Sequence, residues 1–175
     1  MKTNIGISDQ NRAGVVKLLN ALLSDEYVLY TKTRNFHWNV VGPQFNDFHK
    51  FFEGQYEEID AIIDEVAERA RALGGLASGS LGEFLEQSRL KEQPAKSMPA
   101  NAMVASLLSD HEAIIQSLRK DLETAGDKYH DAGTNDFLTG LMEKHEKMAW
   151  MLRATVEPAQ NSADRRSRDN VEVHA

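Results

Sequence analysis

Hydrophobic side chains recur with helical spacing over most of this 175-residue chain. In the first such stretch they return every three or four residues, as on one face of an α-helix: Val15, Leu18, Leu19, Leu22, Leu23 and Tyr27. Ser8 or Asp9 can cap the start of this helix, and a Gly-Pro pair interrupts the pattern after it. The pattern predicts a helix over residues 9–38, preceded by a flexible N-terminal tail, residues 1–8.

The same criteria predict three more long helices and a short one. The second long helix stops at Gly74-Gly75. Ser80, followed three residues later by Glu83, forms a capping-box pattern at the start of the short helix. Asn101 and Thr134 are expected to cap the last two long helices, which a polar segment joins. The predicted bounds are 44–73, 81–89, 101–125 and 134–155.

These elements predict an all-α fold. Four long helices, with the short helix in the crossover between the second and third and no strand pattern, suit a four-helix bundle over residues 9–156. At 41% hydrophobic residues, the chain can bury the core of one domain. Residues 157–175 lose the periodicity and are expected to form a flexible C-terminal tail. The absence of cysteine excludes disulfides, cysteine-ligated zinc and iron–sulfur clusters.

Acidic residues are concentrated in the second predicted helix. The whole chain carries a net charge of −7, and residues 44–73 hold eight acids and three bases, a net −5. Such a concentration attracts cations. The first residues lack the apolar core of a signal peptide, and no apolar run is long enough to span a bilayer. We therefore expect a cytoplasmic protein without membrane contact.

The acidic region also contains a candidate metal-ligand set. His37 and His49 lie twelve residues apart, Glu53 follows His49 by four, and Asp64 precedes Glu68 by four. Residues four apart share one face of a helix, so each pair can point the same way. Imidazole with carboxylates is a ligand set for iron, manganese or zinc.

Helix geometry restricts how this set can be used. Glu53 and Asp64 are eleven residues apart, which is about 16 Å along a helix axis. Ligands lie only about 2 Å from the ion that they share, so one helix cannot bring both pairs to one ion. Either the chain has two half-sites, or a second copy supplies the missing half across a two-fold axis.

At these positions the chain resembles the Dps family, the small dodecameric ferritins. The resemblance rests on HWN at 37–39, on DxxAER at 64–69, and on the segments LLSDEYVLYTKTRNFHW and HEKMAWMLRAT, and it spans most of residues 9–156. It implies a ferritin-like four-helix bundle that assembles into a homo-dodecamer. In that family, two histidines and a carboxylate of one subunit bind ferrous iron together with two carboxylates of its two-fold mate. The matching residues are His37, His49, Glu53, Asp64 and Glu68; many members have Asp in place of Glu53.

The resemblance further implies a ferroxidase that stores iron. Fe²⁺ would enter through acidic pores, for which Asp127, Asp131 and Asp136 are the candidates, and hydrogen peroxide, preferred over dioxygen, would oxidise it. The ferric product would mineralise inside the cage, with Glu57 and Asp60 as candidate nucleation residues. Removing Fe²⁺ and peroxide together would protect the cell and its DNA from oxidative damage.

Two other functions are open. The first is a DNA-binding, nucleoid-associated protein that acts through its tails. Phosphate contacts need lysine and arginine, yet the N-terminal tail region is poor in them and Arg165, Arg166 and Arg168 are diluted by acids. The second is a purely structural bundle, which does not explain the ligand spacing. Trp38, beside His37, is expected to pack in an interface, with electron donation to oxidising radicals as the alternative.

The remaining ionisable residues are expected to be structural. His111, His130, His145 and His174 have no partner at ligand spacing, and His145 is interpreted as part of a helix surface. Asp25 and Glu26 are interpreted as polar-face or interface residues. Ferritins that bind two irons inside one bundle use Glu-x-x-His pairs. No glutamate here is followed by histidine at that spacing, so an in-bundle iron centre is not expected.

Overall fold

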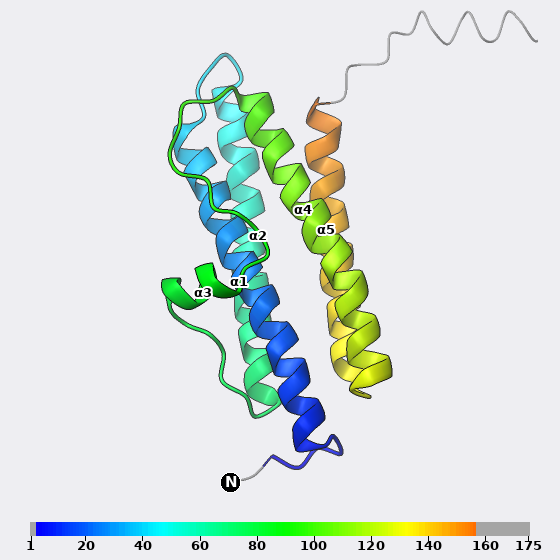
Figure 1. Ribbon diagram of the computed structural model, residues 1–175. Coiled ribbons are helices and arrows are strands. Elements are labelled where there is room, and N and C mark those ends of the chain that lie inside the picture. The colour runs from blue at the N-terminus through cyan, green and yellow to red at the C-terminus, as the bar shows by residue number, and fades with distance from the viewer. Residues whose placement is uncertain (1–2, 157–175) are drawn as a thin grey trace, which may run out of the picture.

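The computed structural model describes residues 3–156 and consists of two helical hairpins packed side by side (Figure 1). The first hairpin pairs α1 (Asp9–Asn39) with α2 (Phe45–Ala72), and the second pairs α4 (Ala100–Glu123) with α5 (Ala132–Val156). The short helix α3 (Leu81–Gln87) lies in the crossover between them. The predicted all-α, ferritin-like bundle is therefore confirmed. The predicted C-terminal tail lies outside the described residues.

The helix caps were partly predicted from the sequence. Ser8 accepts a hydrogen bond from the backbone of Asn11, and the Ser80–Glu83 capping box forms as expected. The predicted cap at Asn101 is wrong, because α4 already begins at Ala100 with Pro99 as its N-cap. Thr134 does not cap α5 either; it lies inside the helix.

Asp131 takes that capping role. It accepts hydrogen bonds from the backbone N–H of Thr134 at 3.0 Å and from the Thr134 hydroxyl at 2.6 Å. A carboxylate directly before a helix satisfies backbone N–H groups that have no partner within the helix. The polar segment expected between the last two long helices is also partly helical, because a wide turn, η1 (Thr124–Lys128), continues α4.

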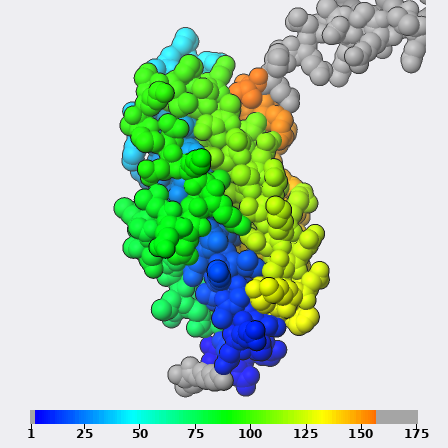
Figure 2. Space-filling view, in the orientation of Figure 1, coloured from blue at the N-terminus to red at the C-terminus, as the bar shows by residue number. Residues whose placement is uncertain are grey.

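The core lies between the two hairpins. Its largest fully buried side chains come from α1, α2 and α4 and include Leu19, Leu22, Leu29, Phe36, Phe52, Ile59, Ile62, Met103, Leu107 and Ile114, and α5 adds Leu138, Leu141 and Leu152. Burying one such side chain contributes about 1.5–3 kcal/mol. The crossover passes over the outer side of α1, where it covers part of that helix (Figure 2). No helix within residues 3–156 is both long and apolar enough to cross a membrane.

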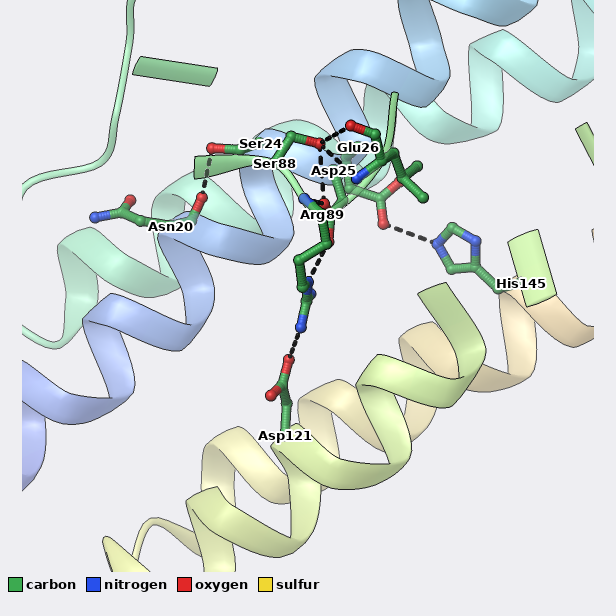
Figure 3. Close-up of polar contacts among 9 residues, drawn as sticks. Asn20, Ser24, Asp25, Glu26, Ser88, Arg89, Asp121 and His145 are labelled. Carbon is green, nitrogen blue, oxygen red and sulfur yellow. Dashed lines mark hydrogen bonds and ion pairs between the residues drawn. The ribbon is translucent and has the colours of Figure 1, made fainter. Parts of the chain in front are cut away.

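Ion pairs connect the hairpins and the crossover. Lys32 of α1 lies 2.6 Å from Asp110 of α4, and Arg69 of α2 donates to Asp131 at 3.0 Å. Arg89, just after α3, donates to Asp25 at 2.7 Å and to Asp121 at 2.8 Å, and so ties the crossover to both α1 and α4 (Figure 3). The second hairpin is thus held to the first by charges as well as by the core.

Candidate metal centre

His37 and His49 meet where the first hairpin turns. His37 lies in the last turn of α1, and His49 lies in the second turn of α2. Their rings stack with centroids 3.7 Å apart. His37 Nδ1 lies 2.7 Å from the carbonyl oxygen of His49, and His49 Nδ1 lies 2.9 Å from the carbonyl oxygen of His37.

These reciprocal contacts determine which nitrogen of each ring carries the proton. A carbonyl oxygen only accepts, so each Nδ1 must donate an N–H. In the neutral imidazole, each Nε2 then keeps a free lone pair. Metal-binding histidines commonly have their other ring nitrogen held by a carbonyl or carboxylate in this way. Both histidines therefore have the tautomer that a metal ligand requires.

Glu53 lies one turn beyond His49, next to an aromatic side chain. The Tyr56 hydroxyl donates to Glu53 Oε1 at 3.4 Å, and the Tyr56 ring meets His37 edge-on with centroids 5.2 Å apart. Partial burial of the phenol and the neighbouring charge of Glu53 raise the pKa of Tyr56, so it stays a neutral donor. Phe45 stacks on His49 with centroids 5.0 Å apart.

A cation–aromatic cluster, absent from the sequence-based prediction, adjoins this group. The Arg34 guanidinium lies 4.7 Å from the ring centre of Tyr56, 5.2 Å from that of Trp38 and 5.5 Å from that of Tyr30. It also donates to the Tyr30 hydroxyl at 2.7 Å. The helical spacing of Tyr30, Arg34 and Trp38 on α1 was a signal that could have revealed it. Trp38 remains 63% exposed.

Asp64 and Glu68 occupy the later turns of α2. Both side chains are exposed and make no hydrogen bond or ion pair with any described residue. Glu65, between them, is by contrast engaged by Lys144 at 3.1 Å. Within residues 3–156 of one protomer, no group of three or more His, Cys, Asp or Glu side chains is arranged to hold a metal ion. The structure therefore joins His37 to His49 but does not bring all five candidate ligands together in one protomer.

The candidate pore residues differ in their environments. Asp127 and Asp136 are exposed. Asp131 is 3% exposed. It forms an ion pair with Arg69 and accepts the capping hydrogen bonds from Thr134. Asp131 thus has a structural role within the protomer. Of the three candidates, Asp127 and Asp136 present their carboxylates to solvent.

The interpretation of His145 as part of a helix surface, and of Asp25 and Glu26 as polar-face or interface residues, is wrong, because all three are buried inside the protomer. His145 and Glu26 are 0% exposed, and Asp25 is 1% exposed. His145 lies on the same face of α5 as three core residues, Leu141, Met148 and Leu152, whose spacing in the sequence could have indicated its burial. His111 is also fully buried and contacts His145, although no local spacing connects them. His130 is exposed, and His174 lies outside the described residues.

Comparison with known proteins agrees with this architecture. Residues 16–161 match the ferritin-like domain family. The chain is 49% identical over 156 residues to the "Uncharacterized low temperature-induced protein all0458" of Nostoc sp., covering 89% of this chain and 87% of the relative. It is 42% identical over 140 residues to "DNA protection during starvation protein 2" of Bacillus anthracis, covering 80% of this chain and 94% of the relative.

Solved structures show the same relationship. The Dps protein of Vibrio cholerae O1, described as a member of a broad superfamily of ferritin-like diiron-carboxylate proteins, superposes with a TM-score of 0.83 at 29% identity and covers 90% of this chain and 98% of that one. The protomer is thus a ferritin-like bundle. Within that class, the chain belongs to the Dps family.

Proposed function

We propose that this protein binds and oxidises ferrous iron at a site shared between two protomers and stores the product inside a dodecameric shell. The observation that carries the proposal is the reciprocal Nδ1–carbonyl pairing of His37 and His49. That pairing leaves a lone pair on Nε2 of each ring, and Glu53 follows His49 by one helical turn on the same face of α2. Imidazole and carboxylate together suit Fe²⁺, and the diiron-carboxylate description of the Vibrio cholerae relative supports the choice of iron.

The second half of the site would come from a two-fold partner. Asp64 and Glu68 are exposed carboxylates without a described partner, about 16 Å or more along α2 from Glu53. In an isologous dimer they would face the His37, His49 and Glu53 group of the other protomer. Iron is the substrate, and the protein residues bind it and orient it.

An apolar surface near the crossover supports the dimer. Leu81 and Leu85 of α3 are 74% and 55% exposed, and they line a groove of about 260 Å³ against Tyr27 and Val28 of α1. Exposed apolar side chains of this kind mark contact surfaces. We assign this surface, together with Trp38, to the contact between two copies of the chain.

Hydrogen peroxide is the proposed oxidant. Two Fe²⁺ ions each give up one electron, and one peroxide molecule takes both with two protons to form two molecules of water. The reaction consumes both reactants that would otherwise produce hydroxyl radicals. Asp127 and Asp136 are proposed to line the iron entrance, and Glu57 and Asp60, both exposed on α2, are proposed to nucleate mineral.

DNA binding is the second candidate function. It is supported by the printed name of the Bacillus anthracis relative, which refers to DNA protection during starvation. The net charge of −7 opposes binding to phosphate, and the arginines that would favour it lie outside the described residues. Protection by removal of iron and peroxide needs no DNA contact, and we therefore favour the iron function, with a cytoplasmic location.

Anaerobic titration with Fe²⁺ followed by hydrogen peroxide tests the proposal. We expect saturable binding of one or two ions per chain, and then ferric absorbance that rises in proportion to peroxide. Double substitution of His37 and His49 by alanine should abolish both signals, whereas His130→Ala, at an exposed histidine, should change neither. Equal binding by the wild-type protein and the double variant would show that iron binds elsewhere.

A further inference from the structure

Three ionisable side chains meet in the core of the bundle, apart from the candidate metal centre. They are Glu26 of α1, His111 of α4 and His145 of α5, and each is 0% exposed. Glu26 Oε1 lies 2.9 Å from His145 Nε2 (Figure 3), and His145 Nδ1 lies 3.0 Å from His111 Nδ1. We call these three residues the core triad. It is a chain of polar contacts that runs from the first hairpin into the second.

The other charged groups near these helices are already paired. On α1, Asp25 is bound by Arg89, which also holds Asp121 of α4. Lys32 of α1 is bound to Asp110 of α4. The buried side chains of α2 are apolar except Gln55, which is neutral. Among the described residues, His145 is therefore the group that can offset the negative charge of Glu26.

The geometry determines how many protons the core triad can hold. A buried carboxylate requires a proton or a compensating positive charge, so a proton must lie on Glu26 or on His145 Nε2, which are 2.9 Å apart but do not form a hydrogen bond. The contact between His145 Nδ1 and His111 Nδ1 requires one more proton, because two lone pairs or two N–H groups at 3.0 Å repel each other. A triad that is neutral overall holds one further proton, which lies either on His111 Nε2 or at the contact between Glu26 and His145 Nε2.

A further proton would leave a net positive charge in the core. On His111 it would lie either on Nδ1, where it would face the N–H of His145, or on Nε2. Burying an uncompensated charge destabilises a fold. His111 Nε2 has no hydrogen-bond partner among the described residues that could stabilise this charge.

We propose that the core triad is a proton-binding latch, which stabilises the packing of α1, α4 and α5 while neutral and loosens it when His111 takes up a proton. Burial and the nearby His145 lower the pKa of His111 well below its ordinary value of 6.5. The unfolded or opened chain then binds more protons than the closed bundle at pH values below 6.5. Stability contributed by the latch is complete above that pH and is lost as the pH falls through the pKa of His111 in the closed state.

The matched variants are His111→Asn and His130→Asn. Asparagine can place a polar atom near the position of Nδ1 but does not titrate, whereas His130 is exposed and outside the core triad. Amide hydrogen exchange of the intact assembly, followed from pH 8 to pH 4, should show protection of α1 and α4 lost in an acid step. That step should move to lower pH in His111→Asn and stay in place in His130→Asn. An unchanged step in a folded His111→Asn protein would overturn the proposal.

A measurement on the unaltered protein covers the case in which His111→Asn does not fold. Exchange of the imidazole C2 hydrogen, read by mass spectrometry, gives the titration of each histidine separately. We expect His111 to titrate in the same pH step in which α1 and α4 lose protection. Titration of His111 at the pH of His130, with protection retained, would overturn the latch. The core triad contains no candidate iron ligand, so this outcome is independent of the proposed iron function.

Discussion

His37 and His49 hold each other's imidazole rings in place through their main chains. Nδ1 of His37 donates to the carbonyl oxygen of His49 at 2.7 Å, and Nδ1 of His49 donates to the carbonyl oxygen of His37 at 2.9 Å. The two residues lie on different helices, so the turn between α1 and α2 and the imidazole tautomers are fixed together. Histidines held in this way need little reorganisation to bind a metal ion. We propose that a second protomer completes the site that these histidines begin.

Co-assembly of two damaged chains tests whether the site is shared. One variant carries His49→Ala with Glu53→Ala, and the other carries Asp64→Ala with Glu68→Ala. Each alone should lose rapid peroxide-driven iron oxidation, because every site lacks half of its ligands. In a mixed dimer, one of the two sites receives only intact residues, so mixed cages should recover up to about half of the wild-type rate. A rate no higher than that of the parent variants would show that the site is not shared.

Tyr56→Phe tests whether the phenol positions Glu53. The change removes the hydroxyl that donates to Glu53 Oε1 but leaves the ring beside His37. Loss of a group that orients a metal ligand weakens metal affinity by about 10–100-fold. We expect Fe²⁺ affinity to fall toward the lower end of that range, because the bond is long and partly exposed. Tyr129→Phe, in a tyrosine outside this group, is the control; equal affinities in both variants would exclude the positioning role.

Arg89→Ala tests the tie between the crossover and the bundle. Asp25 is 1% exposed, and without Arg89 it would be left as a buried charge whose remaining hydrogen bonds come from the Ser88 hydroxyl and the residue 89 backbone. Removing one partner of a buried pair costs about 3–5 kcal/mol. Arg119→Ala breaks an exposed pair with Glu146 and should cost at most about 1 kcal/mol. Urea unfolding of both variants at one protein concentration measures the difference, and similar losses would contradict the assignment.

DNA binding should be weak and dependent on salt. With a net charge of −7 per chain, contacts to phosphate must come from local clusters of basic residues. Such binding strengthens steeply as salt is lowered. Retardation of plasmid DNA should be absent or faint at physiological salt and should increase at low salt. Tight retardation that does not change with salt would establish DNA as a principal partner.

The sequence alone determined the features that depend on neighbours within one or two helical turns. Apolar periodicity located the helices, the Ser80–Glu83 pair located the start of α3, and four-residue spacing placed His49 with Glu53 on one face of α2. The motif resemblance led to the family that the comparisons then showed. These features were predictable because local backbone geometry determines them whatever packs against the helix.

Only the tertiary structure decided which faces of different helices meet. It buried Glu26, His111 and His145 together, although they come from three helices and share no local spacing. It also made Asp131 the cap of α5 and the partner of Arg69. The sequence shows the same residue whether an ionisable side chain is solvated or buried. Its protonation and role depend on the dielectric surroundings and on the partner that the opposite helix supplies, and these arise only when the hairpins pack.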